Sequence, residues 1–360
     1  MKESKHSSQY YLKLLLDREY KSIFNKDTQN IIQNKVVLVT GAGGSIGSEI
    51  CRQLIKYNPS KIILVGHGEN SIYQIHKELV GKTHIELEPR IVEIQNANRV
   101  NQLLKDSRPQ LVFHAAAHKH VPLMEKNPYS AIENNVIGTL NLAEASGQVG
   151  VDHFIFISTD KAVEPNNVMG ATKKIAEKVI FHCNQKYTTK YGTVRFGNVL
   201  ASRGSVIPLF VEQILAGEPV TVTDPNMTRY FMSIEEAASL VIESNRFLSG
   251  GEVFILNMGD SVKIIQIAER LIQTFAKTNV PITYTGIRNG EKTEENLLEQ
   301  SERLSLRMRD NLMISDTTPL DFEIIKKLIC SYEDLEKDLL LEYLLGITNE
   351  ANMVEDGEFV

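Results

Sequence analysis

The sequence has few cysteines, no long apolar run and no excess of positive charge. Its three cysteines, Cys51, Cys183 and Cys330, are too scattered for a disulfide framework or a paired zinc motif. Its apolar runs, such as residues 36–39, are far shorter than the roughly 20 residues that cross a bilayer. Lysine and arginine number 39 against 45 acidic residues, and this net charge of -6 argues against a broad nucleic-acid surface.

The N-terminus shows no secretion signal. It begins Met-Lys-Glu-Ser-Lys-His and lacks an apolar segment followed by a small-residue cleavage site. Together with the scattered cysteines and the short apolar runs, this predicts a cytoplasmic protein with no membrane span. The expected partners therefore include neither nucleic acid nor a membrane.

What the chain does contain is an alternation of strand-like and helix-like segments. Its 360 residues, 42% apolar and 23% charged, suit one large domain or two unequal ones. Short β-branched runs are separated by amphipathic stretches, which predicts an α/β fold: a Rossmann doubly wound parallel sheet. We predict strands at 36–39, 62–65, 91–94, 111–113, 154–157 and 193–196, and helices at 45–57, 71–79, 131–147 and 171–187.

The regions outside this alternation are less regular. Residues 1–34 form a predicted helical arm, whose stretch 10–24 either docks on a surface or stays loose. Beyond residue 200 we expect helices near 234–247, 261–274 and 321–345. The predicted organisation is a Rossmann domain at 35–200, to which about 230–260 returns, a smaller and mainly substrate-binding C-terminal α/β lobe at 201–345, and an acidic mobile tail at 346–360.

The strongest single motif follows the first predicted strand. Gly-Ala-Gly-Gly-Ser-Ile-Gly at 41–47 connects that strand directly to a helix. Glycines at these spacings allow a tight turn, backbone approach to a pyrophosphate and close helix packing, and the helix N-terminus favours phosphate. The motif predicts a dinucleotide cofactor on Gly41, Gly43, Gly44, Ser45, Ile46 and Gly47.

The choice between NAD and NADP depends on the end of the second strand. An acidic residue about 20 residues after the glycines usually holds the adenosine ribose. Gly66 occupies that position, and Glu69 is the nearest acidic residue that could replace the usual one. There is no obvious arginine to bind the 2′-phosphate of NADP. NAD is therefore preferred and NADP stays open. Glu93 and Ile94, after the third strand, suit an adenine contact, although Glu93 could equally be a surface residue.

Two further strand ends carry polar residues. After the fourth strand, the small residues Ala115, Ala116 and Ala117 would let a nicotinamide ribose approach. His118, Lys119 and His120 follow as a predicted polar rim rather than a metal site, because no cysteine or carboxylate set converges there. The fifth strand leads into Ser-Thr-Asp-Lys at 158–161, and Met-Gly-Ala-Thr-Lys at 169–173 follows on a helix.

Together these motifs resemble the extended short-chain dehydrogenases/reductases. More narrowly, they resemble the UDP-N-acetylglucosamine 4,6-dehydratases of bacterial polysaccharide synthesis, in their long and usually membrane-anchored branch. The resemblance covers about residues 12–300 and is carried by segments 40–49, 115–125, 158–161, 194–199, 228–232 and 286–292. Residues 14–19 resemble the segment that joins the membrane part to the catalytic part, so we expect a catalytic unit without the anchor.

The resemblance implies a reaction. UDP-N-acetylglucosamine would be oxidised at C4, lose water across C5 and C6, and regain hydride at C6, with the C5 configuration retained. Asp160 would be the acid at the C6 oxygen and Lys161 the base at C5. Thr159 would hydrogen-bond the C4 oxygen, and Lys173 the nicotinamide ribose.

One substitution leaves a proton unassigned. Met169 stands where most of the superfamily has a tyrosine base, and the long branch shares this substitution. A thioether cannot accept the C4 hydroxyl proton, so Asp160, Lys161 or a water molecule are the candidates.

The remaining predicted contacts concern the nucleotide sugar. The predicted substrate-binding residues are His118, Lys119 and His120 of the polar rim together with Asn198, Arg203, Arg229, Arg288 and Glu291. The resemblance implies Arg229 and Arg288 at the diphosphate and Glu291 at the uridine ribose. It also implies a homo-oligomer, a dimer or larger. The alternatives are a C5-inverting dehydratase, a 4-epimerase or reductase on the same scaffold, and a non-catalytic NAD or nucleotide-sugar binding protein.

Overall fold

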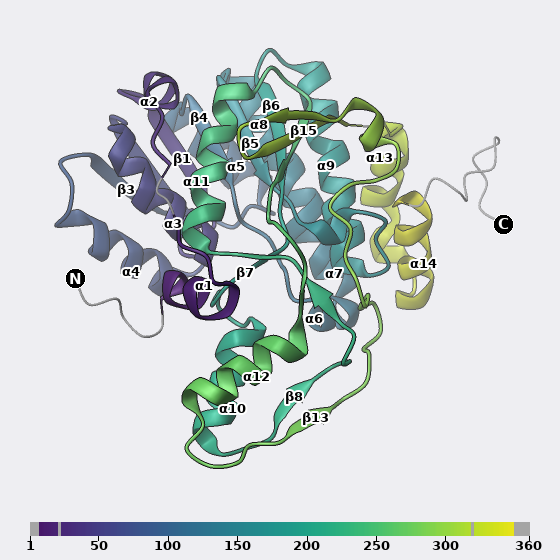
Figure 1. Cartoon of the computed structure of the whole chain (residues 1–360). Coiled ribbons are helices and arrows are strands. Elements are labelled where there is room, and N and C mark those ends of the chain that lie inside the picture. Colours follow the sequence, from purple (N-terminus) through teal and green to yellow (C-terminus); the bar gives the residue numbers. More distant parts are fainter. Residues whose placement is uncertain (1–6, 21–22, 318–319, 349–360) are drawn as a thin grey trace.

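The computed structural model describes residues 7–20, 23–317 and 320–348, and a nine-stranded sheet lies at its centre (Figure 1). The strand order is β14-β15-β11-β6-β5-β4-β1-β2-β3. Strands β11 to β3 pair in parallel, whereas β15 and β14 add antiparallel strands at one edge. The bounds are β1 Val36–Thr40, β2 Lys61–Gly66, β3 Glu86–Ile91, β4 Leu111–His114, β5 His153–Ile157, β6 Lys190–Arg195, β11 Glu252–Leu256, β14 Arg307–Arg309 and β15 Leu312–Asp316.

Helices cover both faces of this sheet. Alternate residues of β1 show why: Leu38 belongs to one apolar cluster, whereas Val37 and Val39 belong to the other. Helices α5 (Ala97–Ser107), α8 (Gly138–Val149) and α9 (Val168–Lys186) contribute to the first cluster. Helices α3 (Ser45–Leu54), α4 (Glu69–Val80) and α11 (Ile234–Ser244), with α2 (Lys26–Ile32), contribute to the second. The predicted doubly wound Rossmann fold is confirmed.

A smaller lobe lies beside the carboxyl ends of the parallel strands. Figure 1 shows α10, α12, β8 and β13 together, away from the main sheet. The lobe has an apolar cluster of its own, which includes Phe210, Val220 and Leu271. Its elements are α10 Val206–Ala216, α12 Ile264–Phe275, and the strand pairs β8 Val220–Val222 with β13 Ile282–Tyr284, β9 Thr228–Arg229 with β12 Val262–Lys263, and β7 Asn198–Val199 with β10 Phe231–Met232.

The N-terminal arm docks on this lobe. Helix α1 (Ser8–Leu16) buries Leu12 and Leu15 in the lobe's apolar cluster. The Ser8 hydroxyl donates to the Leu200 carbonyl at 3.1 Å. The helix ends earlier than the predicted stretch 10–24, because Asp17 takes a left-handed conformation at φ 50°.

Three other predicted elements differ from the structure. Strand β3 spans Glu86–Ile91, whereas a strand was predicted at 91–94. The prediction was misplaced because this edge strand is largely exposed and carries no apolar run. The predicted helix 321–345 is two helices, α13 (Phe322–Ser331) and α14 (Lys337–Thr348), which pack on α9 in the main core. β14 and β15 also join the main sheet, although 201–345 was predicted to be mainly substrate lobe.

Two predictions concern the ends of the chain and the membrane. Of the predicted acidic tail, 346–348 lie in α14 and 349–360 lie outside the described residues. None of the helices within the described ranges combines the length and apolar character that crossing a bilayer requires.

Candidate active site

The glycine-rich turn between β1 and α3 is built for close backbone approach. Gly41 has φ +64°, and a Cβ there would lie 2.7 Å from the main-chain carbonyl carbon and oxygen of Ala115. A Cβ on Gly47 would run into the Gly41 carbonyl oxygen. Gly44 caps α3 without a side-chain hydrogen bond, so the first main-chain N–H groups of the helix stay available for an anion.

A cavity of about 320 Å³ opens over this turn. It contains most of the predicted cofactor positions: Gly41, Gly43, Gly44, Ile94, Ala115, Ala116 and Ala117. Ser45, Ile46 and Gly47 lie next to it in the first turn of α3. The lining also includes residues that sequence reasoning missed, namely His67, Ser71, Gln95 and Asn134. These four come from three separate segments, so no local motif marks them.

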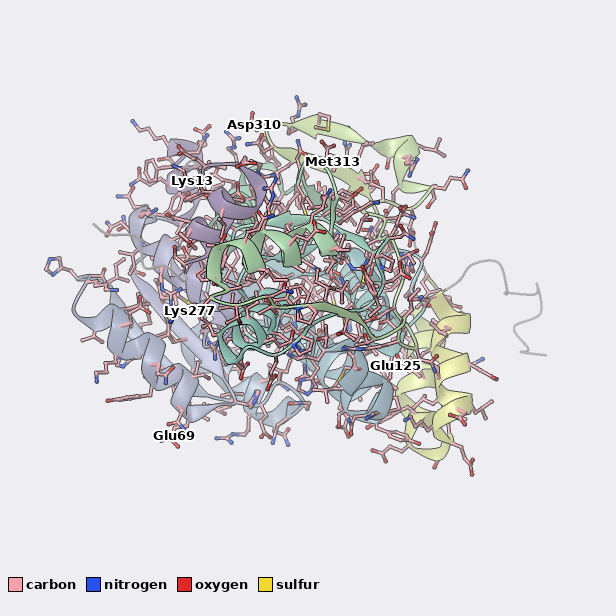
Figure 2. The ribbon with its side chains drawn as sticks, turned by 60° about the horizontal axis from the view of Figure 1, so that its bottom comes forward. Lys13, Glu69, Glu125, Lys277, Asp310 and Met313 are labelled. Carbon is pink, nitrogen blue, oxygen red and sulfur yellow. The ribbon has the colours of Figure 1, made fainter. Side chains whose placement is uncertain are left out.

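At the end of β2, Gly66 occupies the usual ribose-binding position, so no carboxylate stands there. A Cβ on Gly66 would meet the Ile72 side chain at 3.0 Å. Glu69, the predicted substitute, is exposed in the first turn of α4, and Figure 2 shows it at the outer edge of the molecule. Val92 and Ile94 line the cavity, whereas Glu93 between them is exposed.

Arg203 and His118 were predicted to contact substrate, but the structure places both in the lining of this cavity. The Arg203 guanidinium donates to the Gly43 carbonyl, and its main-chain N–H donates to the Ser45 hydroxyl at 3.1 Å. An arginine from the 200–205 loop therefore lies across the glycine turn, which adds positive charge where a pyrophosphate would lie.

A buried polar chain joins β1 to α8 beneath the cavity. His114 Nδ1 lies 2.7 Å from the Thr40 hydroxyl, and its Nε2 lies 2.9 Å from the Thr139 hydroxyl. The Thr139 hydroxyl donates its proton to the Asn135 carbonyl, so it accepts from Nε2, and Nδ1 accepts from Thr40. Burial, together with the smaller effect of the Lys173 charge, lowers the pKa of His114 to about 3. His114 is therefore a neutral structural residue.

A π-helical segment, Ile132–Ile137, positions the loop after β4. It follows α6 (Val121–Lys126) and α7 (Pro128–Ala131). Its Asn135 accepts from the His118 main-chain N–H at 2.8 Å and donates to the His118 carbonyl at 3.0 Å. Single π turns often mark functional sites, and this one directs Asn134 into the cavity.

The carboxyl end of β5 carries an ion pair between Asp160 and Lys161. Asp160 is fully buried, and its Oδ1 accepts from the Thr159 hydroxyl at 2.8 Å and from Lys161 Nζ at 3.0 Å. No group within the described residues hydrogen-bonds its Oδ2. A Cβ on Gly197 would lie 2.9 Å from Oδ2, so only glycine leaves that oxygen its space.

Met169 and Lys173 lie on one face of α9, one turn apart. Met169 is 3% exposed and packs in the main core. Lys173 Nζ donates to the Ile157 carbonyl at 2.6 Å and lies 3.8 Å from the centre of the Phe156 ring. Burial lowers the pKa of Lys173 to about 7, opposed by nearby Glu177. Lys173 is therefore hydrogen-bonded to the last residue of β5.

The loop around 286–295 supplies a residue that sequence reasoning missed, Glu295. This buried carboxylate lies 3.8 Å from Lys161 Nζ and 4.0 Å from Arg229 Nη2. Arg229, predicted at the diphosphate, is buried and donates to the main-chain carbonyls of Thr228, Lys292 and Thr293 at 2.7–3.0 Å. It therefore ties this loop to β9. The motif at 286–292 ends three residues before Glu295, and that proximity was the available signal.

The other predicted substrate residues lie on several loops, and of them Asn198 contacts the catalytic turn. Asn198 Oδ1 accepts from Lys161 Nζ at 3.4 Å. Lys119 donates to the Ser202 hydroxyl at 3.4 Å, and His120 contacts the position where Gly204 would carry a Cβ. Arg288 is exposed and lies 3.9 Å from Glu291. The described residues contain no group of three His, Cys, Asp or Glu side chains arranged to hold a metal.

Comparison with known proteins places this geometry in a family. Residues 37–317 match the family described as polysaccharide biosynthesis protein. The chain belongs to this family. The match supports the resemblance seen in the motifs.

Three similar proteins define the relationship. The chain is 47% identical over 344 residues to the probable polysaccharide biosynthesis protein EpsC of Bacillus subtilis, covering 94% of this chain but only 58% of EpsC. It is 33% identical over 277 residues to a UDP-N-acetylglucosamine 4,6-dehydratase (inverting) of Campylobacter jejuni, covering 76% of this chain and 80% of that enzyme. The solved structure of Pen from Bacillus thuringiensis superposes with a TM-score of 0.76 at 31% identity, covering 84% and 99% of the two chains.

Proposed function

We propose that this chain is a nicotinamide-dependent nucleotide-sugar 4,6-dehydratase. Its substrate is UDP-N-acetylglucosamine and its product is a UDP-4-keto-6-deoxy-N-acetylhexosamine with the C5 configuration retained. The observation that carries the proposal is the ion pair between buried Asp160 and part-buried Lys161 at the carboxyl end of β5, the same edge of the parallel sheet at which the glycine turn follows β1. The similarity to a named dehydratase supports it.

The residues around the cavity fit a nicotinamide dinucleotide. The bare main chain at Gly41 and the free N-terminus of α3 suit the pyrophosphate, with Arg203 across the turn. Ile94 is placed for the adenine and Ala115–Ala117 for the nicotinamide ribose. A bound nicotinamide supplies reversible oxidation at C4 of the sugar. NAD is the proposed form, because among the lining residues only Arg203 is an arginine and it already bonds the turn.

The two charged residues divide the proton chemistry. Asp160 protonates the C6 oxygen so that it leaves as water, since its Oδ2 is buried and has no hydrogen-bond partner within the described residues. Lys161 removes the C5 proton once C4 is a ketone, because that ketone makes the C5 proton acidic. Thr159 lies beside both groups and hydrogen-bonds the C4 oxygen. Asn198 holds Lys161 toward the sugar.

The test is to identify the product. The purified full chain is incubated with UDP-N-acetylglucosamine and either NAD⁺ or NADP⁺, and the mixture is followed by ¹H NMR. We expect a 6-methyl signal and a 4-keto sugar, with ring couplings that report retention at C5. Formation of only the C4 epimer would identify an epimerase, and an inverted C5 would identify the inverting reaction. Tight cofactor binding without any product would make the chain a binding protein.

A further inference from the structure

The loop that carries Glu295 is held against the catalytic turn from two directions. On the lobe side, Arg229 donates to two carbonyls of this loop, those of Lys292 and Thr293. On the sheet side, Lys292 Nζ donates to the Val163 carbonyl at 3.1 Å, and Asn167 Nδ2 donates to the Gly290 carbonyl at 2.9 Å. These contacts set the position of the Glu295 main chain relative to Lys161, so the fold itself keeps Glu295 and Lys161 close together.

The Glu295 side chain differs from the other buried carboxylates. Glu177 and Glu302 both pair with the buried Arg195 at hydrogen-bond distance, and Glu302 also accepts from the Glu299 main-chain N–H at 2.8 Å. Glu295 is 7% exposed, yet its nearest cations are 3.8 and 4.0 Å away, and nothing in the described part of the chain hydrogen-bonds its Oε2. Burying a carboxylate without close partners is costly, which suits a group that changes protonation.

The proposed reaction also requires one more proton acceptor than β5 provides. Protons move at the C4 hydroxyl, at C5 and at the C6 oxygen, and Met169 cannot take any of them. Asp160 and Lys161 are two groups for three transfers. Lys161 can act as a base only after it loses its own extra proton, and Glu295 is the carboxylate within reach that is not already serving as the acid.

We propose that Glu295 is the proton-exchange partner of Lys161, an inference that rests on the proposed dehydratase function. One N–H bond of the Lys161 ammonium breaks and one O–H bond forms on Glu295, which leaves a neutral amine and a neutral carboxylic acid. The amine then takes the C5 proton, later returns it, and recovers its first proton from Glu295. Asp160, ionised at the start, takes the C4 hydroxyl proton and later passes it to the C6 oxygen, which leaves as water. No electrons move in the Lys161–Glu295 exchange, and Asp160, Lys161 and Glu295 all end the cycle in their starting protonation states.

The distances require a small movement. Transfer needs a contact near 2.8 Å, so the two side chains must approach by about 1 Å when the sugar closes the site. Because it acts through Lys161, Glu295 is a positioning residue and not a catalytic one. Burial raises its pKa; Lys161 opposes this rise, Asp160 adds to it, and Arg229 and Lys292 oppose it.

The kinetic test uses Glu295→Gln, Glu295→Asp and the control Glu294→Gln, whose side chain is exposed one residue away. We expect Glu295→Gln to lower kcat about 100-fold, to leave KM within about threefold, and to remove the acidic limb of the kcat–pH profile. Glu295→Asp should regain part of kcat, and Glu294→Gln should match wild type. A Glu295→Gln variant with the wild-type profile and kcat would overturn the inference.

A second measurement does not need turnover. In protein labelled with ¹³C at the glutamate carboxyls, the Glu295 signal is assigned by its loss in Glu295→Gln and titrated with pH. Removing the opposing cation in Lys161→Met should raise the titration midpoint by about one pH unit or more. An unchanged midpoint would refute the pairing, even if the wild type proves inactive on UDP-N-acetylglucosamine, a result that would count against the proposed function alone.

Discussion

The two sides of the candidate site consist of different kinds of chemical group. The cofactor side consists of main chain and small side chains: the 41–47 turn, the first turn of α3 and the alanines after β4. The catalytic side consists of charged side chains, Asp160, Lys161, Arg229 and Glu295, which come from three separate segments. In the proposed reaction, the first side recognises the shape of the cofactor and the second controls proton transfer.

This difference predicts opposite sensitivities. On the cofactor side, where the main chain must come close to a ligand, an added methyl group should weaken cofactor binding. Exchanging one polar side chain for another there should have little effect. On the catalytic side, an exchange that keeps shape but removes charge should be the most harmful. Substitutions on each side should therefore change different measured parameters.

Asp160→Asn should lower kcat about 1,000-fold while cofactor affinity stays within about twofold, because the amide keeps the shape but cannot donate the acidic proton. NMR of the product measures turnover, and a fluorescence titration measures cofactor binding. Asp152→Asn, at the exposed start of β5, is the matched control and should keep full activity. Undiminished water elimination in Asp160→Asn would remove the acid assignment and with it the contrast between the two sides.

Two glycine substitutions should separate the sides. Gly41→Ala places a methyl group 2.7 Å from Ala115 at a positive φ, so we expect about 10-fold weaker cofactor binding and a loss of about 1–3 kcal/mol in stability. Gly197→Ala places one 2.9 Å from Asp160 Oδ2, so kcat should fall about 10- to 100-fold with cofactor binding unchanged.

Gly81→Ala is the control for both, because its φ is negative and nothing lies within 4 Å of its Cβ position. Cofactor titrations, turnover and thermal melts are measured on all three variants. If Gly41→Ala and Gly197→Ala affect the same parameter, the two sides do not act separately.

Lys173 contacts the end of β5, and its titration should affect how the free energy of unfolding depends on pH. Its pKa is lowered by burial to about 7, below the ordinary value of 10.5, so between these pH values the unfolded chain binds one proton more than the folded one. Stability should therefore rise with pH across this window, by up to about 1.4 kcal/mol per pH unit from this group. Urea unfolding at pH 7, 8 and 9 should show a flatter dependence in Lys173→Met; an equal slope would contradict the prediction.

The smallest effects concern two neighbours at the end of β3. Ile94→Ala removes apolar contact from the cavity and should weaken cofactor binding about 3- to 10-fold. Glu93→Gln should change it less than about twofold, since this side chain is exposed. Isothermal titration calorimetry of both variants measures their cofactor affinity. A larger loss of affinity in Glu93→Gln than in Ile94→Ala would identify the Glu93 carboxylate as the adenine contact.

Sequence reasoning works best where a function is encoded in consecutive residues. The glycine turn, Asp160 and Lys161 each follow a buried strand, and the carboxyl ends of parallel strands meet at one edge. It failed for β3, whose exposed edge position leaves no apolar pattern, and for the division between α13 and α14, where apolar residues continue through the break. It also failed for Glu295, which resembles its exposed neighbour Glu294 in every local respect.

By itself, the sequence determined the order of strands and helices, the turn for a pyrophosphate and the presence of an acid beside a lysine. These features depend on residue spacing, hydrophobic periodicity and the conformational freedom of glycine, all of which are local. Only the tertiary structure decided that Arg229 anchors a loop, that Arg203 crosses the glycine turn and that Glu295 faces Lys161. Burial and charge pairing depend on groups brought together from distant parts of the chain, and no spacing along the sequence specifies them.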